Sequence, residues 1–248
     1  MIASATKPVR LPEAVTVRHG PVNLLSQFFL AADQYVRDRG VKLYIRHDMD
    51  ELLRLNEQQT AAGNWYPVSG TFDHRLSRLS PSNSYWIAGV NDAGEIVVAQ
   101  SMRLYRWGTS SLADHAASLL FGDSEPTGPC RVECPQAFLI TGNVAYGGAL
   151  WIRPDYRRIG IGGLVSQTSR SYAMATWGTS WVVAYVKRDQ IDKKMHEVYG
   201  FTKHEFSIRF PDTQWGNLDF ALCWQDGLDL LARVEEFTFR LERKMVAA

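Results

Sequence analysis

The chain has few of the features that mark secreted, membrane-spanning or nucleic-acid-binding proteins. Its 248 residues include only three cysteines, an odd number that argues against a disulfide framework and favours a reducing cytoplasm. No segment approaches the roughly 20 apolar residues that a membrane span needs, and residues 1–7 lack the apolar core of a signal peptide. The formal net charge of +1 gives no electrostatic reason to expect nucleic acid or an anionic membrane as the main partner.

Metal-ligand spacing is also missing. Cys130 and Cys134 form a C-x-x-x-C pair in a proline-rich stretch, but a zinc site needs two more ligands, and Cys223 is distant. No histidine lies at paired spacing, so these residues are interpreted as free thiols. The acidic cluster at residues 47–51 is interpreted as the start of a helix, with Asp48 or Asp50 as its cap. We therefore expect no metal.

The composition is that of an ordinary globular protein, with 46% hydrophobic and 21% charged residues. The chain is long enough to bury a sizeable core. It contains no internal repeats and no low-complexity linker, so a single domain over residues 1–248 is the simplest organisation.

The most informative stretch is residues 156–163, with the sequence YRRIGIGG. It follows an apolar run that ends at Ile152 and precedes a helix-like segment that begins at Leu164. Closely spaced glycines let the backbone approach a ligand, and the unpaired N–H groups of a helix N-terminus favour negative charge. The stretch therefore predicts a site for a phosphate or pyrophosphate group.

The spacing distinguishes between the known kinds of phosphate site. The glycines fit neither the dinucleotide fingerprint nor the P-loop, because Val165 stands where the third glycine of the fingerprint belongs and no Lys-Ser or Lys-Thr follows. What fits is R-x-x-G-x-G from Arg157 to Gly162, preceded by L-x-I-x-P-x-Y from Leu150 to Tyr156. This resembles the pyrophosphate-binding motif of the GNAT superfamily of acyl-CoA-dependent N-acyltransferases.

A second motif follows in the order that GNAT proteins have. Residues 181–186 are apolar and β-branched, as in a buried strand. Apolar residues then recur at helical spacing from Ile191 to Tyr199, and Gly200 ends that helix in a C-cap position before Phe201. The resemblance implies that this strand splays from the strand of the glycine motif. The pantetheine arm would lie between Leu150–Ile152 on one strand and Val182–Ala184 on the other.

The chain departs from the family pattern at two positions. Many members have a tyrosine four residues before the glycine of Gly-Phe, where it protonates the leaving thiolate; here that residue is His196, and Tyr199 is a rival donor. An imidazolium with a pKa near neutrality could also act as this acid. Asp189 stands where the family often has an asparagine that bonds the pantetheine arm. The resemblance thus assigns acyl-CoA binding to ten residues: Leu150, Ile152, Arg157, Arg158, Ile159, Gly160, Ile161, Gly162, Gly163 and Asp189.

The remaining elements follow the GNAT order from residue 41 to 224. Apolar periodicity predicts helices over residues 25–36, 50–60 and 230–241, and strands over residues 41–45, 85–90, 96–99, 143–152, 201–208 and 218–224. We expect an α/β (α+β) fold of the GNAT type, with a mixed, mostly antiparallel central sheet flanked by helices. Residues 1–40 and 225–248 would be N- and C-terminal helical extensions.

The acceptor side has weaker indications. Residues 106–136 separate two strands that a tight hairpin would otherwise join, and a helix over residues 112–121 with later prolines and glycine is expected there to cover the cleft. Aromatic residues that could line an acceptor site are Trp65, Tyr66, Trp107 and Tyr146, although core packing is the commoner role. Candidates for the general base, from chain position alone, are Asp48, Asp50 and Glu51.

The resemblance implies an N-acyltransferase, and more narrowly an N-acetyltransferase, that uses acetyl-CoA or another acyl-CoA. An amine of a small molecule or peptide would attack the thioester directly in a ternary complex, and homo-oligomers are possible. Two alternatives stay open. The missing tyrosine and asparagine allow an inactive acyl-CoA-binding sensor or partner module, and the glycine loop alone allows a phosphate-binding protein unrelated to GNAT.

Overall fold

A computed structural model describes residues 8–123, 129–213 and 215–246, and for residues 244–246 it describes the backbone only. Residues 1–7, where the signal-peptide expectation falls, lie outside the described part, as do Pro126 and Gly128 of the predicted insertion. None of the described helices is long and apolar enough to cross a lipid bilayer.

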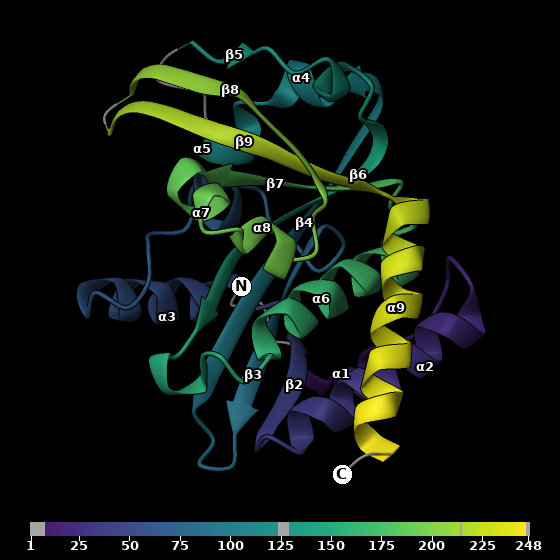
Figure 1. Cartoon of the computed structure of the whole chain (residues 1–248). Coiled ribbons are helices and arrows are strands. Elements are labelled where there is room, and N and C mark those ends of the chain that lie inside the picture. The colour runs from purple at the N-terminus through teal and green to yellow at the C-terminus, as the bar shows by residue number, and fades with distance from the viewer. Residues whose placement is uncertain (1–7, 124–128, 214, 247–248) are drawn as a thin grey trace.

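A twisted sheet of nine described strands forms the centre of the molecule, in the order β1-β2-β3-β4-β6-β7-β9-β8-β5 (Figure 1). The pair β6 and β7 is parallel, whereas every other neighbouring pair is antiparallel. The strands are β1 (Val9–Arg10), β2 (Val41–Arg46), β3 (Ser84–Asn91), β4 (Ile96–Ser111), β5 (Arg131–Val132), β6 (Thr141–Ile152), β7 (Trp181–Lys187), β8 (Lys203–Thr213) and β9 (Gly216–Asp226).

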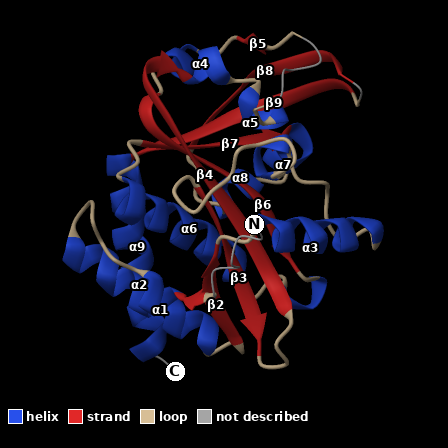
Figure 2. Ribbon diagram, turned by 180° about the vertical axis from the view of Figure 1, so that it is seen from behind, coloured by secondary structure: helices blue, strands red, loops and turns tan. Residues whose placement is uncertain are grey.

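Helices cover both faces of this sheet. α2, α6 and α9 lie on one face and α3 on the other, as the opposite views of Figures 1 and 2 show. The helices are α1 (Leu11–Ala14), α2 (Val22–Arg37), α3 (Met49–Ala61), α4 (Leu112–His115), α5 (Ser118–Phe121), α6 (Ile161–Trp177), α7 (Arg188–Asp192), α8 (Met195–Val198) and α9 (Gly227–Val246), with 3₁₀ turns at Gly70–Phe72, Pro135–Phe138 and Pro154–Tyr156.

Alternation along the strands builds two hydrophobic cores. In β3, Tyr85 and Ile87 join the core under α2, α6 and α9, while Trp86 and Ala88 join the core on the opposite face. The segments predicted as terminal extensions supply α2 and α9 to the first core, where they pack against each other and against α6. The predicted limits of the central part of the domain, residues 41–224, stay a prediction.

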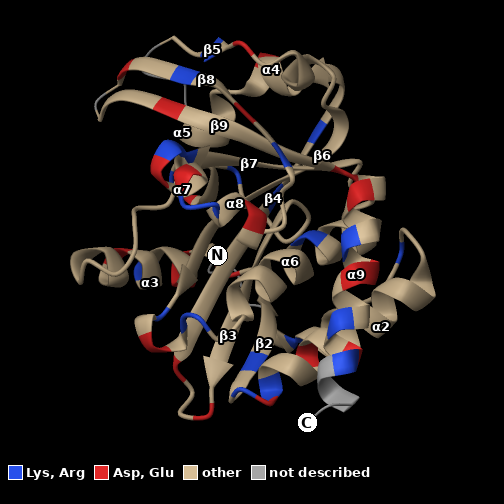
Figure 3. Ribbon diagram, in the orientation of Figure 1, with Lys and Arg blue, Asp and Glu red and all other residues tan. Residues whose placement is uncertain are grey.

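Lys, Arg, Asp and Glu are interspersed over the surface, as along α9 (Figure 3).

The strands β6 and β7 pair only at their beginnings. Cα partners join Val144–Tyr146 to Trp181–Val183, and both strands then continue without pairing to each other (Figure 1). A bulge in β6 lies just beyond this point, where Ala149 has a φ of 51° and the register with β4 shifts. The sheet therefore opens into a gap between β6 and β7.

Three predicted elements differ from the structure. The helix expected from Ile191 to Tyr199 is broken into α7 and α8, because Lys194 takes a left-handed conformation with a φ of 55° between them. β4 continues to Ser111, so the insertion begins later than residue 106. The helix expected over residues 112–121 is two short helices, α4 and α5.

Candidate functional site

The glycine loop leads into the N-terminus of α6. Gly160 is the N-cap, with a left-handed φ of 81° and no side chain to cap the helix, and the first turn contains no acidic residue. The first N–H groups of the helix have no intrahelical acceptor. A Cβ at Gly160 would lie 2.7 Å from the Tyr35 hydroxyl, and one at Gly163 would lie 2.7 Å from the Val198 carbonyl oxygen. Only glycine fits these positions, so the backbone itself forms the cradle.

The residues beside these glycines hold the loop in place. A Cβ at Gly162 would lie 2.8 Å from Cδ1 of Ile152, so Ile152 packs under the loop. The Arg39 Nε donates to the Ile159 carbonyl oxygen at 3.2 Å. Ile161 begins the helix with its side chain buried, whereas the Ile159 side chain is partly exposed.

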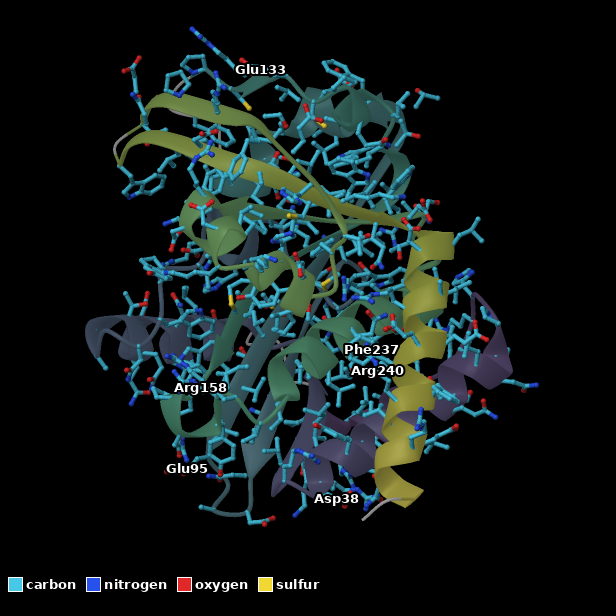
Figure 4. All side chains as sticks on the ribbon, in the orientation of Figure 1. Asp38, Glu95, Glu133, Arg158, Phe237 and Arg240 are labelled. Atoms are coloured by element: carbon cyan, nitrogen blue, oxygen red, sulfur yellow. The ribbon has the colours of Figure 1, made fainter. Side chains whose placement is uncertain are left out.

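The two arginines of the loop have different surroundings. The Arg157 guanidinium donates to the carbonyl oxygens of Ile152 at 2.9 Å and Asn64 at 3.4 Å, so it braces the loop. Arg158 has a left-handed φ of 66° and makes no hydrogen bond or ion pair with any described residue. Its exposed side chain lies on the loop before α6 (Figure 4). Arg158 is therefore the arginine that is available to an anion.

A cavity of about 510 Å³ occupies the gap between β6 and β7. Gly147–Leu150 of the β6 bulge line one side, and Val182, Ala184 and Val186 of β7 line the other. Ser166 of α6 also lines it, one turn after Gly162 and Gly163. The cavity thus begins where the glycine cradle ends. Of the predicted donor-site residues, Leu150 lies in the cavity wall, whereas Ile152 lies under the loop.

Gln100 of β4 fixes the bulge from the side. Its Nε2 donates to the Gly148 carbonyl oxygen at 2.9 Å, while its buried Oε1 has no partner among the described residues. The side chain lines the cavity, so this oxygen is a potential acceptor for a ligand N–H group. No local pattern around Gln100 predicts this role, because it depends on the pairing of β4 with β6.

Tyr199 and His196 lie differently with respect to the cavity. Tyr199 lines it, and its phenol has no hydrogen-bond partner among the described residues. Burial raises the pKa of Tyr199, which keeps the phenol protonated. His196 does not line the cavity; its ring lies 4.3 Å from that of His204, and burial together with His204 lowers its pKa. In the segment after the break at Lys194, Tyr199 lies in the cavity wall and His196 does not.

The other predicted polar residues lie outside this cavity. Asp189 pairs with Lys193 at 3.5 Å, and it is the next residue, Gln190, that lines the cavity. Asp48 caps α3 by accepting from the Glu51 N–H at 3.0 Å. Asp50 contacts Nε2 of His74 at 2.8 Å, and Glu51 pairs with Arg46. The structure does not bring the three base candidates to the cavity.

Aromatic side chains form part of the cavity wall. Trp65, Tyr66 and Tyr146 line it, as predicted candidates for an acceptor site, but Trp107 stacks on His115 at 5.2 Å instead. Trp215 from the β8–β9 hairpin and Leu120 from α5 also contribute, so the insertion reaches this wall.

No cluster of three or more metal-ligating side chains occurs among residues 8–123, 129–213 and 215–246. Within the same described residues, Cys130, Cys134 and Cys223 are free thiols.

The sequence matches no protein-family model, and a comparison with curated proteins gives no match. Among solved structures, the chain is similar to an uncharacterized protein from Bacillus halodurans, with a TM-score of 0.51 and 14% identity over 84% of this chain and 95% of that one. It is also similar to Arabidopsis thaliana NAA60 in complex with acetyl-CoA, with a TM-score of 0.49 and 13% identity over 75% of this chain and 98% of that one.

A further similar structure is a mutant of the SpeG spermidine N-acetyltransferase from Vibrio cholerae, with a TM-score of 0.47, 10% identity, and coverage of 79% of this chain and 98% of that one. At these identities the likeness concerns the fold alone. The order of the elements, the parting of β6 from β7 and the glycine N-terminus of α6 are features that the sequence resemblance led us to expect. The expected architecture is therefore confirmed: the chain has a mixed, mostly antiparallel central sheet flanked by helices, and its likeness to the Bacillus halodurans protein concerns this fold.

Proposed function

We propose that the protein is an N-acyltransferase that transfers an acyl group, such as acetyl, from acyl-CoA to an amine. The observation that carries this proposal is the continuity of the site. An uncapped, glycine-built helix N-terminus leads within one turn, at Ser166, into a cavity between two splayed strands. A phosphate-binding protein would need the first feature but not the second.

The residues of the site are suited to bind acyl-CoA, the acyl donor. The pyrophosphate would accept hydrogen bonds from the N–H groups of Ile161, Gly162 and Gly163, at the positive end of the α6 dipole. Arg158 would add a charge-assisted contact. The pantetheine arm would enter the gap between β6 and β7, where Gln100 Oε1 can accept from one of its amide N–H groups.

The transfer itself needs few groups from the protein. The amine nitrogen attacks the thioester carbonyl, so that a C–N bond forms and the C–S bond breaks. Backbone N–H groups of the bulge near Leu150 would stabilise the oxyanion. The Tyr199 phenol would donate its proton to the departing thiolate and regain one from solvent. The amine proton would leave through water, because the cavity lining contains no aspartate, glutamate or histidine among the described residues.

The acceptor would be a small-molecule or peptide amine that enters along the aromatic part of the cavity wall. Trp65, Tyr66 and Trp215 offer apolar and π surfaces there for its body. The free thiols of the chain favour a cytoplasmic location.

Thiol release tests the proposal. The purified chain is incubated with acetyl-CoA and a panel of amines, and free CoA is followed with a thiol reagent, alongside a calorimetric titration of CoA. We expect CoA to bind and at least one amine to accelerate thiol release. Binding without turnover over a broad panel would favour the alternative, an inactive acyl-CoA sensor. Failure of CoA to bind would contradict both.

A further inference from the structure

Arg170 is a buried cation in the wall of the cavity. It lies on α6 with only 2% of its surface exposed, and it is among the residues that line the space between β6 and β7. It is also the only charged residue of α6, whose sequence from Ile161 to Trp177 otherwise contains apolar and neutral polar residues. A fully buried arginine ordinarily needs an ionic partner.

No carboxylate among the described residues provides that partner. The guanidinium donates to the Ser166 carbonyl oxygen at 3.2 Å, to Gln225 Oε1 at 3.2 Å and to Gln167 Oε1 at 2.8 Å, all of which are neutral. A guanidinium has five N–H groups, so these three bonds leave two without an acceptor. Burial, aided by nearby Arg233, lowers the pKa of Arg170 to about 9, which reflects the cost of an uncompensated charge.

The place of Arg170 separates it from the pyrophosphate cradle. It follows Gly162 by eight residues, which corresponds to roughly 12 Å along the helix axis. The Arg170 guanidinium lies over the Phe201 ring at 4.9 Å. A Cβ at Gly200 would lie 2.4 Å from Nη2 of Arg170. One turn earlier, the Ser166 hydroxyl donates to the Tyr199 carbonyl oxygen at 3.2 Å. Arg170 therefore belongs to the thioester end of the site.

The rest of the cavity lining adds a second positive charge to that of Arg170. Its one other charged lining residue is Lys187, whose Nζ lies 5.1 Å from the centre of the Tyr66 ring and which forms no ion pair with any described residue. With two cations and no acidic side chain, the described lining favours an anion and disfavours a polycation.

We propose that Arg170 binds a carboxylate carried by a ligand inside the cavity. The two N–H groups without acceptors would donate to that carboxylate, which would supply the ionic partner that the described residues do not provide. The carboxylate can come from a dicarboxylic acyl group of the donor or from an amino acid that serves as the acceptor. This inference rests on the proposed function, because it takes the cavity to be the acyl-transfer site.

Matched ligand pairs separate the two sources. In the donor arm, calorimetry compares succinyl-CoA with butyryl-CoA, which has a methyl group in place of the carboxylate. In the acceptor arm, the protein saturated with CoA is titrated with the three aromatic amino acids and with their amides. We expect about tenfold or tighter binding of the carboxylate member in one arm, the size of a charge-assisted hydrogen bond in a buried site.

The variant Arg170→Gln should bring that ratio to within about twofold while CoA itself binds as before, because the cradle is distant. Arg240→Gln, which removes an exposed cation on α9 (Figure 4), is the matched control and should keep the full ratio. Should Arg170→Gln fail to fold, the affinity ratios of the wild-type protein and of Lys187→Gln test the inference.

Three results would overturn the inference. The first is equal affinity for the carboxylate ligand and its neutral counterpart in both the donor and the acceptor experiment. The others are a carboxylate preference that Arg170→Gln retains, and a carboxylate preference that Lys187→Gln abolishes. In each of these cases CoA would still bind, so the proposed function would stand. If CoA itself failed to bind, the proposed function would fail first.

Discussion

The N-terminus and the middle of α6 present positive charge in different ways. At the N-terminus, the charge comes from backbone N–H groups and from the exposed Arg158, so water can satisfy these groups when no ligand is present. Eight residues beyond Gly162, it comes from Arg170, which is buried and held by neutral acceptors. The first position suits a strongly charged group at the surface. The second suits selection, because a buried charge discriminates between ligands more strongly than a screened one.

The largest effect should come from Tyr199→Phe. This variant keeps the ring that packs against the hydrophobic core and removes only the phenol hydroxyl, so the thiolate would lose its proton donor. We expect kcat to fall roughly 100- to 10,000-fold while acetyl-CoA affinity stays the same. Steady-state kinetics and a calorimetric titration measure the two quantities. A comparable loss in His196→Gln but none in Tyr199→Phe would transfer the role to His196.

Gly160→Ala should damage the cradle alone. Its added Cβ would meet the Tyr35 hydroxyl, and a φ of 81° strains any side chain. Gly94 has the same φ of 81° in a turn with no atom within 4 Å, so Gly94→Ala reproduces the backbone strain without the clash. We expect CoA to bind roughly tenfold more weakly to Gly160→Ala, about 1.4 kcal/mol, and normally to Gly94→Ala. Equal affinities in the two variants would show that the loop does not hold the pyrophosphate.

The two loop arginines should separate binding from stability. Arg158→Gln removes a cation that pairs with no described residue and should weaken CoA binding by a few-fold, an effect that shrinks as salt rises. Arg157→Gln removes two bonds to backbone carbonyls and should chiefly lower the melting temperature. Titrations at two ionic strengths and thermal melts make this comparison. The reverse pattern would exchange the roles of the two residues.

The smallest effect concerns His196 and pH. Its pKa is lowered by burial and by His204, so below the ordinary value of 6.5 the unfolded chain takes up a proton that the folded chain resists. The free energy of unfolding should therefore fall as pH drops below 6.5 toward the lowered folded-state pKa. The variant His196→Gln should have a flatter dependence between pH 7 and 5 in denaturant unfolding. An unchanged slope would mean that other groups account for acid sensitivity.

The glycine cradle was predictable because it is contiguous. The motif from Leu150 to Gly163 is recognisable from the spacing of its own residues. The order of helices and strands followed from apolar periodicity. The break at Lys194 was not predictable, because two successive lysines without glycine or proline give no local reason for the helix to end there. In the segment after that break, Tyr199 lies in the cavity wall and His196 lies outside it.

Gln100 and Arg170 of the cavity wall were missed because distant segments assemble the cavity. Gln100 acts through the pairing of β4 with β6, which no local pattern encodes. Arg170 did leave one signal: it is the single charge in a helix that is otherwise apolar or neutral, which is unlike the usual charged outer face of a surface helix. A lone arginine in such a helix indicates burial and merits attention as a ligand-binding candidate.

A crystal structure of the protein with CoA tests the central claim most directly. We predict the pyrophosphate on the N–H groups of Ile161, Gly162 and Gly163, the pantetheine arm between β6 and β7, and the sulfur within hydrogen-bond reach of the Tyr199 phenol. CoA bound elsewhere, or a sulfur that contacts neither Tyr199 nor the bulge at Ala149, would contradict this account of the site.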